Sequence, residues 1–230
     1  MVLECRHLKF TYPGSETAVI NNLSFLMEKP GFNALFGPSG AGKTSLAKII
    51  AQMITRFEGE ILTKDMNTVL YSYNLERLPG WSSIGNHLDK VTPEEKQNLK
   101  AQLIDIFDLK AVMNSRFSML SMGQQNRINL IRYLLQDFDL LILDESLANV
   151  DELLRETIIL AIKELFGHKM FLYISHNLME VSKFCSRILV LGNPSHEKSG
   201  SMIDGRDYQS GYRLDKKELD ATMLEIMNAF

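Results

Sequence analysis

A glycine-rich loop between an apolar run and a helical pattern constrains this chain more than any other feature. The three pieces lie in residues 32–50, FNALFGPSGAGKTSLAKII, and the loop matches G-x-x-x-x-G-K-[ST] at Gly37, Gly42, Lys43 and Thr44. Glycines leave room for successive backbone N–H groups to turn inward around a phosphate, and the helix after the loop adds its positive N-terminal end. A chance glycine-rich turn is the alternative, but the strand pattern before the loop and the helical pattern after it argue against that.

The chemistry of the loop predicts a nucleotide site. Lys43 can reach the β- and γ-phosphates, and the Thr44 hydroxyl is placed to ligate Mg²⁺. Contacts to the nucleotide are expected from the whole loop and the start of its helix, namely Gly37, Pro38, Ser39, Gly40, Ala41, Gly42, Lys43, Thr44 and Ser45.

Two adjacent carboxylates follow a second apolar run. Residues 140–143, LLIL, have the continuous apolar pattern of a strand buried on both faces, and Asp144 and Glu145 come directly after it. The carboxyl ends of such strands are where open α/β sheets bind ligands. Asp144 would hold Mg²⁺ through water, and Glu145 would be the base that polarises an attacking water. Paired acids can also cap a helix, but the buried run and the upstream loop favour the metal and base roles.

Two further side chains lie where a nucleotide site could use them, although the local pattern does not decide their roles. Tyr12 lies in the turn TYPG, where its ring is either ordinary surface packing or a face on which adenine stacks. From position alone, surface packing is favoured. His176 follows the buried strand predicted at residues 170–175. A lone histidine is usually structural, but this one ends a strand that would neighbour the phosphate site.

The segment LSMGQ, residues 120–124, leads directly into the helical pattern QNRINLIRYLL. Ser121 and Gly123 at a helix start would form a second anion-binding corner, or Ser121 would be a plain N-cap. On this segment alone the N-cap is favoured, and both alternatives remain open.

Composition narrows the function classes. With a net charge of −3 over 230 residues, the chain has no basic footprint for nucleic acid. Its longest apolar stretches, such as residues 140–143 and 158–162, are too short to cross a bilayer, and its charged N-terminus does not match a signal peptide. Cys5 and Cys185 lack metal-ligand spacing and are expected to be free, buried thiols in a reducing compartment. We therefore expect a soluble, cytoplasmic protein.

Periodicity predicts strands around the loop and a helical insert after them. Residues 2–28 have β patterns, a turn at residues 58–61 enters a short strand, and residues 68–73 are predicted to be a buried strand. An exposed, adaptable loop is expected at residues 75–88. Thr92-Pro93-Glu94-Glu95 has the pattern of a capping box that opens a helix within the insert.

The second half of the chain alternates helices and strands. After a helix capped by Asp151, strands are predicted at residues 170–175 and 188–191, with a possible short strand at residues 202–203. Residues 215–230 are predicted to form an amphipathic helix that packs on the chain's own core rather than serving a regulatory role.

In this order, the pieces resemble the ATP-binding subunit of ABC transporters over nearly the whole chain. GPSGAGKT is similar to the Walker A loop, LLILDE to Walker B and LSMGQ to the LSGGQ signature. The resemblance also places Tyr12 at the aromatic A-loop, residues 146–151 at the D-loop and His176 at the H-loop, and Arg127 and Arg132 follow the family's pattern.

The resemblance implies a fold and a set of ligands. The expected fold is a single α/β domain over residues 1–230, with a P-loop NTPase (RecA-like) core at residues 1–75 and 137–230. This core would carry an N-terminal antiparallel β subdomain and an inserted helical subdomain at residues 76–136. The expected ligands are ATP and Mg²⁺, with adenine stacked on Tyr12.

The resemblance also implies a mechanism. Two identical or similar chains would form a head-to-tail dimer, in which Ser121, Gly123 and Gln124 of one chain complete the ATP site of the other. Glu145 would be the catalytic base, and His176 would contact the γ-phosphate. The dimer would drive transport through transmembrane permease subunits at the inner face of the membrane. The chain looks most like bacterial importers that also use a substrate-binding protein.

Three positions depart from the family's pattern. Counted back from Trp81, Asn74 falls where the family has the Q-loop glutamine, which contacts the metal and the attacking water. Met122 replaces the first signature glycine, and Ser146 replaces the usual proline after Glu145. Asn74 is one methylene shorter than glutamine, which bears on how the metal site would be coupled to the permease.

Two other functional classes remain as alternatives. A soluble ABC-type ATPase acting on nucleic acid or ribosomes would typically carry two cassettes or a long coiled-coil insertion, and neither fits in 230 residues. A small-molecule P-loop kinase would share the loop but would not need LSMGQ or His176. ATP-driven transport, without a nucleic-acid partner, is therefore the predicted function.

Overall fold

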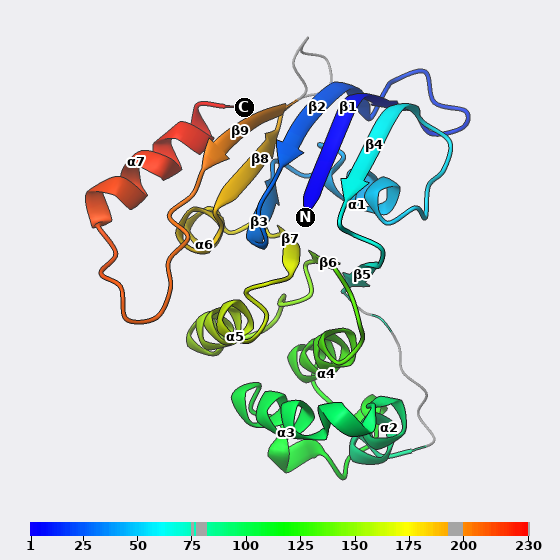
Figure 1. The fold of residues 1–230 in the computed structure, drawn as a ribbon, viewed down its shortest axis with the longest axis vertical. Helices are drawn as coiled ribbons and strands as arrows, with labels where there is room; N and C mark the ends of the chain where they lie inside the picture. The colour runs from blue at the N-terminus through cyan, green and yellow to red at the C-terminus, as the bar shows by residue number, and fades with distance from the viewer. Residues whose placement is uncertain (75, 77–81, 193–199, 230) are drawn as a thin grey trace.

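The computed structural model describes residues 1–74, 76, 82–192 and 200–229, and shows two β-sheets with helices between and below them (Figure 1). The N-terminal sheet is antiparallel, in the order β2-β1-β4. Its strands are β1 (Val2–Phe10), β2 (Ile20–Met27) and β4 (Glu58–Lys64). The expected N-terminal antiparallel β structure is thus confirmed.

The larger sheet has the order β5-β6-β7-β3-β8-β9. It contains β3 (Gly31–Phe36), β5 (Val69–Tyr73), β6 (Leu140–Asp144), β7 (Met170–Ile174), β8 (Arg187–Leu191) and β9 (Gly200–Asp204). Its neighbouring strands are parallel except for β8 and β9. The carboxyl ends of β3, β6 and β7 therefore meet at one edge, where such sheets bind ligands.

Seven α-helices occur in the described part of the chain: α1 (Lys43–Ile50), α2 (Ile84–Val91), α3 (Gln97–Ile106), α4 (Met122–Leu134), α5 (Glu152–Leu165), α6 (Leu178–Phe184) and α7 (Lys216–Met227). Three 3₁₀ turns lie within the helical insert: η1 (Glu94–Lys96), η2 (Lys110–Val112) and η3 (Phe117–Met119). Helices α2, α3 and α4 form a layer at the end of the molecule away from the N-terminal sheet (Figure 1). Among the described residues, none of the helices has both the length and the apolar character to cross a membrane.

The apolar run of β6 explains how the layers pack. Leu140 and Ile142 point into a core shared with α1 and the N-terminal sheet. Leu141 and Leu143 point the other way, into the core formed with α4 and α5. Both faces of the strand are buried, so its residues are apolar up to Leu143. The polar residues Asp144 and Glu145 come at its carboxyl end.

Part of the region expected to be a loop is helical. The loop prediction for residues 75–88 is wrong in its second half, because α2 begins at Ile84. Ser83 caps this helix, and its Oγ accepts a hydrogen bond from the Asn86 N–H, 3.3 Å away. Residues 75 and 77–81 lie outside the described residues.

Thr92 ends a helix instead of beginning one. Its Oγ1 donates a hydrogen bond to the Leu88 carbonyl oxygen at the end of α2, 2.6 Å away. The predicted capping box is therefore wrong, since a capping threonine must accept a hydrogen bond from the backbone that follows it. The next helix, α3, begins only at Gln97, after the turn η1.

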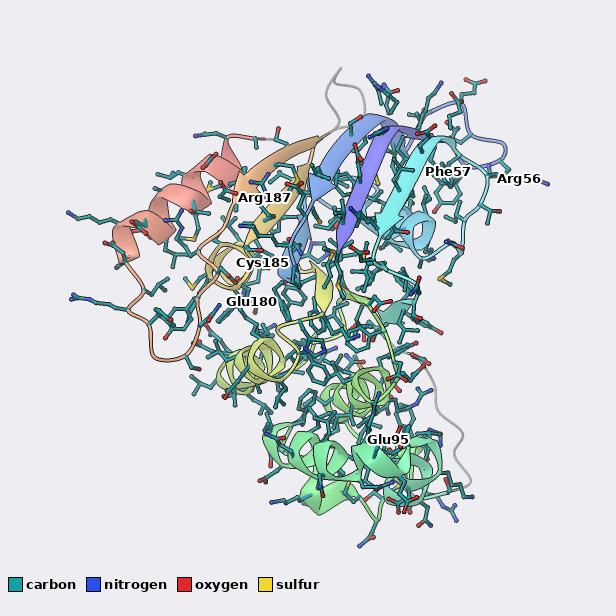
Figure 2. All side chains as sticks on the ribbon, in the orientation of Figure 1. Arg56, Phe57, Glu95, Glu180, Cys185 and Arg187 are labelled. Atoms are coloured by element: carbon teal, nitrogen blue, oxygen red, sulfur yellow. The ribbon has the colours of Figure 1, made fainter. Side chains whose placement is uncertain are left out.

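Other expectations have mixed outcomes. The strand predicted at residues 68–73 exists as β5, but it lies at the edge of the sheet and is only partly buried. Helix α6 was not predicted. Helix α7 packs against α6 and β9 with Leu219 and Ile226 buried, which confirms the packing expected for the terminal helix. Cys5 and Cys185 are free and buried, as predicted, and Cys185 is labelled in the interior in Figure 2.

Candidate functional site

The glycine-rich loop joins the end of β3 to the start of α1. A Cβ on Gly37 would lie 2.4 Å from the Leu191 carbonyl oxygen, and one on Gly42 would lie 2.9 Å from the Val19 carbonyl oxygen. Gly42 also has a φ of +89°, in the left-handed region that favours glycine. Close backbone approach therefore requires both fixed glycines of the motif.

Lys43 bends back into the loop that it follows. Its Nζ donates hydrogen bonds to the carbonyl oxygens of Gly37 and Pro38, each 2.8 Å away. Burial lowers the pKa of Lys43, while the nearby carboxylates of Glu145 and Asp144 oppose that shift. A cation thus lies inside a loop whose amides are suited to bind phosphate.

Asp144 ends β6 and presents a nearly buried carboxylate. Its Oδ2 accepts hydrogen bonds from Thr44 Oγ1 at 3.0 Å and from the Tyr71 hydroxyl at 2.6 Å. Burial, together with the hydrogen bond to Asp144, raises the pKa of Tyr71 far above its usual value, so the hydroxyl remains a donor. Thr44 and Asp144, two of the three predicted metal ligands, are therefore side by side, and their oxygens are of the kind Mg²⁺ prefers.

The residues that follow β6 and β7 meet because the two strands are parallel neighbours. Glu145 Oε1 lies 2.7 Å from His176 Nε2, and both side chains are about half exposed. Glu145 has a φ of +53°, and its N–H donates to the Ile174 carbonyl oxygen at 3.2 Å. A non-glycine residue in this region costs about 1–3 kcal/mol, and strain of this kind clusters at active sites and switch regions, although seven other non-glycine residues described here also have a positive φ.

A pocket of about 400 Å³ is lined by most of the residues predicted to contact the nucleotide, but not by Gly37, Pro38 or Ala41. Tyr12 lies in its wall, where its hydroxyl is 2.9 Å from Ser45 Oγ and its ring makes an edge contact with Phe10. With 44% of its surface exposed, Tyr12 keeps a ring face available for stacking. The other lining residues are Val19, Ser39, Gly40, Gly42, Lys43, Thr44, Ser45, Asp144, Glu145 and His176.

Asn74 follows β5 beside the acidic end of the pocket. It lines an adjoining pocket of about 410 Å³ with Thr44, Asp144 and Glu145. Its Oδ1 is buried and has no hydrogen-bond partner among the described residues. Such an atom costs about 1–3 kcal/mol unless a ligand or water satisfies it.

The side-chain oxygens of Thr44, Asp144 and Asn74 are metal ligands of a kind that fits Mg²⁺. The described residues contain no group of three or more His, Cys, Asp or Glu side chains that could hold a metal by themselves. Mg²⁺ usually keeps several waters and binds through one or two protein oxygens together with substrate phosphates. A hydroxyl, a carboxylate and an amide oxygen with no hydrogen-bond partner among the described residues match that requirement, since all three lie beside a phosphate loop.

The LSMGQ segment begins α4 with a capping box. Ser121 Oγ accepts from the Gln124 N–H at 3.3 Å, and Gln124 Oε1 accepts from the Ser121 N–H at 2.9 Å. A Cβ on Gly123 would lie 2.2 Å from the Asn149 carbonyl oxygen, so packing of α4 on the loop after β6 requires this glycine. None of these three predicted site residues lines the pocket that contains Lys43. The structure therefore does not bring them to the phosphate loop of their own chain.

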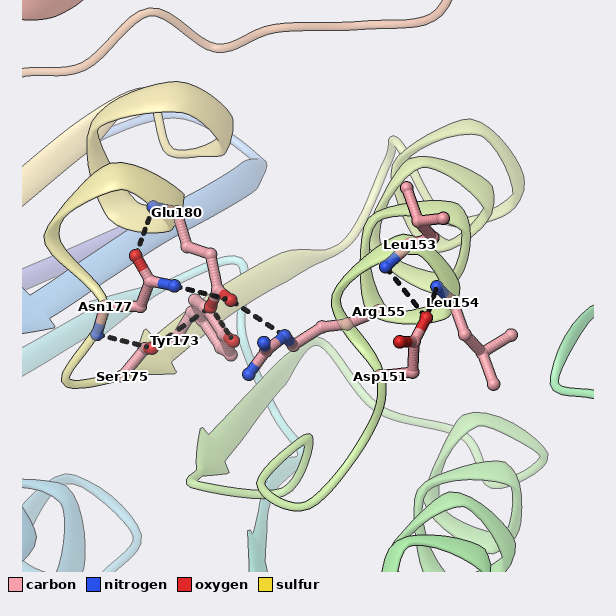
Figure 3. A network of polar contacts seen from close by, with 8 residues as sticks. All are labelled: Asp151, Leu153, Leu154, Arg155, Tyr173, Ser175, Asn177 and Glu180. Atoms are coloured by element: carbon pink, nitrogen blue, oxygen red, sulfur yellow. Dashed lines mark hydrogen bonds and ion pairs between the residues drawn. The ribbon is translucent and has the colours of Figure 1, made fainter.

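The segment that carries His176 is held by a buried carboxylate (Figure 3). Glu180 of α6 accepts hydrogen bonds from the Tyr173 hydroxyl at 2.8 Å and from Ser175 Oγ and Asn177 Nδ2, each at 3.1 Å. Since Ser175 and Asn177 flank His176, these contacts fix the backbone on both sides of it.

Arg127 and Arg132 support the helical insert and do not line the nucleotide pocket. Arg127 Nη1 donates to the Phe107 carbonyl oxygen, 2.6 Å away. Arg132 Nη1 lies 3.2 Å from Glu76 Oε1 in an ion pair. Both arginines thus stabilise α4 against its neighbours.

Sequence reasoning missed three residues of this site: Tyr71, Arg155 and Glu180. The alternation of β5 could have placed Tyr71 on the same face of the sheet as Asp144, given the pairing of β5 with β6. Arg155 and Glu180 lie on different helices, α5 and α6, and no local pattern pairs them.

Comparison with known proteins agrees with this geometry. The family model described as ABC transporter matches residues 20–148. The carnitine transport ATP-binding protein of Listeria monocytogenes is 30% identical over 210 residues, which cover 83% of this chain and 53% of that protein. The phosphonates import ATP-binding protein of Treponema denticola is 29% identical over 224 residues, which cover 84% of this chain and 87% of that protein. The chain thus spans about half the length of the carnitine relative.

Solved structures share the fold. The dimeric structure of a bacterial ABC transporter cassette matches with a TM-score of 0.73 at 19% identity, covering 90% of this chain and 100% of that one. The structure of a bacterial ABC exporter with ATP bound matches with a TM-score of 0.78 at 18% identity, covering 99% of this chain and 41% of that one. A lipid A-core flippase of Pseudomonas fluorescens is similar in sequence, at 29% identity. The likeness confirms the expected α/β P-loop NTPase fold.

Proposed function

The chain belongs to the ABC transporter family and is one of its ATPase cassettes, and we propose that it drives solute import by hydrolysing ATP beside a separate membrane permease. The observation that carries this proposal is the pocket in which Lys43, Asp144, Glu145 and His176 converge. An ammonium, two carboxylates and an imidazole around a phosphate loop are the groups needed to position a phosphoryl transfer to water.

ATP binding would use the phosphate loop, the Tyr12 ring and the three predicted metal ligands. The loop amides and Lys43 would hold the phosphates of ATP, while the Tyr12 ring would stack on adenine. Thr44, Asp144 and Asn74 would hold Mg²⁺, which neutralises charge on the phosphate oxygens.

The chemical step uses the half-exposed pair at the ends of β6 and β7. Glu145 would accept a proton from the attacking water. His176, 2.7 Å from Glu145, would align that carboxylate and contact the γ-phosphate. The contacts of Glu180 with the residues flanking His176 support this role, because they hold the imidazole on a fixed backbone.

Two chains would close head to tail around two ATP molecules. Ser121, Gly123 and Gln124 lie at the N-terminal end of α4, outside the pocket of their own chain. A helix N-terminus attracts phosphate, so these residues would complete the ATP site of the partner chain. The solved dimer of a cassette with the same fold supports this arrangement.

Import through a permease is the finer part of the proposal. The phosphonates import relative supports it, because the chain spans 87% of that protein's length. The subunit would then work at the cytoplasmic face of the membrane, with permease subunits and a substrate-binding protein in the same system.

The variant Glu145→Gln tests the ATPase. It should bind ATP but lose about a hundredfold or more in turnover, because general-base catalysis contributes that much. Light scattering after size-exclusion chromatography should show that it accumulates as a dimer with ATP. Lys43→Ala is the control, since it should lose the thermal stabilisation that ATP gives to the parent chain. Turnover of Glu145→Gln at the parent rate would contradict the role of Glu145 as base.

Co-purification tests the transport part. A polytopic membrane protein should accompany the tagged chain from detergent-solubilised membranes, and should stimulate its ATP turnover. Recovery with ribosomes or nucleic acid instead would contradict transport while leaving the ATPase intact.

A further inference from the structure

Tyr71 reaches the metal-binding end of the site from an edge strand. In the pairing of β5 with β6, Tyr71 lies opposite Ile142, two residues before Asp144. Residues diagonal to one another across a strand pair share a face and lie within reach of an aromatic side chain. The Tyr71 hydroxyl accordingly donates to Asp144 Oδ2, 2.6 Å away.

The Asp144 carboxylate receives this hydrogen bond in addition to the one from the phosphate-loop helix. Thr44 Oγ1 donates to the same oxygen at 3.0 Å. Asp144 is only 8% exposed, so its orientation depends on protein partners more than on bulk water. Of the two donors, Tyr71 is the one that does not belong to the nucleotide loop.

The strand that carries Tyr71 is locked to β6 from its opposite face. Ser146 Oγ donates a hydrogen bond to the Ser72 carbonyl oxygen at 2.9 Å and lies 3.0 Å from Ser72 Oγ, within hydrogen-bond distance. A proline at position 146 has no hydroxyl to make either contact. The strand that carries Tyr71 is therefore paired with β6 and bonded to the segment after it, and none of these contacts involves the nucleotide loop.

We propose that Tyr71 is a positioning residue for Mg²⁺: its hydroxyl fixes the Asp144 carboxylate, so that Asp144 is oriented before nucleotide binds. This inference rests on the proposed ATPase function and adds to it a residue that acts through Asp144. Partners that orient a metal ligand typically change metal affinity about 10–100-fold when they are removed.

The neighbouring residue on the same face provides a matched control. Tyr73 stacks on Tyr71, with ring centroids 5.9 Å apart and planes at 23°. No hydrogen bond of its hydroxyl occurs among the described residues, and its ring is 44% exposed. Tyr71→Phe and Tyr73→Phe therefore remove the same atom from adjacent stacked rings, and only the first removes a contact with Asp144.

The experiment measures equilibrium binding of a fluorescent ATP analogue to the full chain, first in EDTA and then along a Mg²⁺ titration. Thermal unfolding of both variants shows that each is folded. For Tyr71→Phe, we expect unchanged affinity in EDTA and a Mg²⁺ midpoint raised about tenfold, the lower end of the usual range for such partners. For Tyr73→Phe, both quantities should equal those of the parent.

Two results would overturn the inference while leaving the ATPase proposal standing. One is an equal Mg²⁺ midpoint in the parent and both variants. The other is an equal loss of affinity in EDTA and in Mg²⁺ for Tyr71→Phe, which would show a general effect on the pocket. A parent chain that binds no nucleotide under either condition would instead refute the proposed function, and the inference with it.

Discussion

The guanidinium of Arg155 lies against the buried carboxylate of Glu180, with Nε 2.8 Å from Oε1 (Figure 3). Arg155 belongs to the first turn of α5, just after the loop that follows β6, and Glu180 belongs to α6. Because Glu180 also accepts hydrogen bonds from both neighbours of His176, this ion pair joins two segments that border the nucleotide pocket.

Loss of this ion pair should destabilise the fold. Arg155→Met keeps most of the side-chain volume but leaves Glu180 without its cation, at a cost of about 1–3 kcal/mol in the free energy of unfolding. Lys183 and Glu156 form a control pair between the same two helices, with Nζ 2.7 Å from Oε1 and a carboxylate more exposed than that of Glu180. Glu156→Gln should cost at most about 1 kcal/mol.

Urea unfolding of the single and double variants measures the difference between the two pairs. The double-mutant cycle of Arg155→Met with Glu180→Gln should give a larger coupling energy than the cycle of Lys183→Met with Glu156→Gln. Equal coupling energies would mean that burial of Glu180 does not strengthen its ion pair.

The sequence predicted the positions of the glycine-rich loop and the two acids well, because their signals are local. The loop at residues 37–42 lies between a strand and a helix, as the motif requires, and residues 140–143 form a strand buried on both faces. Such patterns depend on neighbours along the chain. Asp144 and Glu145 could be placed at the sheet edge because a continuous apolar run has few other ways to pack.

One error concerned a local helix end, whereas the residues that were missed make tertiary contacts. Threonine is a common residue type at helix starts, but the Thr92 hydroxyl donates its hydrogen bond to the Leu88 carbonyl oxygen, one turn earlier in the chain. The contacts of Tyr71 with Asp144 and of Arg155 with Glu180 join residues on different elements. A single sequence without the sheet order cannot pair them.

Ser121→Arg tests whether the start of α4 completes the partner's site. In the Glu145→Gln background, we expect it to abolish ATP-dependent dimerisation, because the arginine side chain would occupy the space of the partner's phosphate. Nucleotide should still bind to the single chain through Lys43 and Tyr12. Size-exclusion chromatography with ATP measures the dimer. If Ser121 were only the N-cap, the variant would lose about 1 kcal/mol of stability and would dimerise normally.

Gly123→Ala tests a structural requirement at the same place. Its Cβ would lie 2.2 Å from the Asn149 carbonyl oxygen, so α4 must move relative to the loop after β6. Overpacking of this kind costs about 1–3 kcal/mol, and thermal unfolding without nucleotide should show the loss. An unchanged unfolding temperature would mean that the loop after β6 can shift to make room for the added methyl group, and that packing does not require glycine at position 123.

Asn74→Gln tests the coupling between the metal site and the permease. The buried Oδ1 of Asn74 has no hydrogen-bond partner among the described residues, and glutamine would carry that oxygen about 1.5 Å further. We expect nearly unchanged ATP affinity, since Lys43 and the loop amides bind the phosphates. Turnover should change, because a displacement of about 1 Å at a reacting group can alter a rate about a hundredfold.

The change in turnover should be larger in the assembled transporter than in the isolated subunit, because the coupling acts only when the permease is present. The control is Asn67→Gln, which adds the same methylene at an exposed position away from both pockets. ATP turnover of the two preparations, with and without permease, separates a local effect on chemistry from an effect on coupling. If Asn74→Gln leaves both rates at the parent value, Asn74 does not occupy the coupling position.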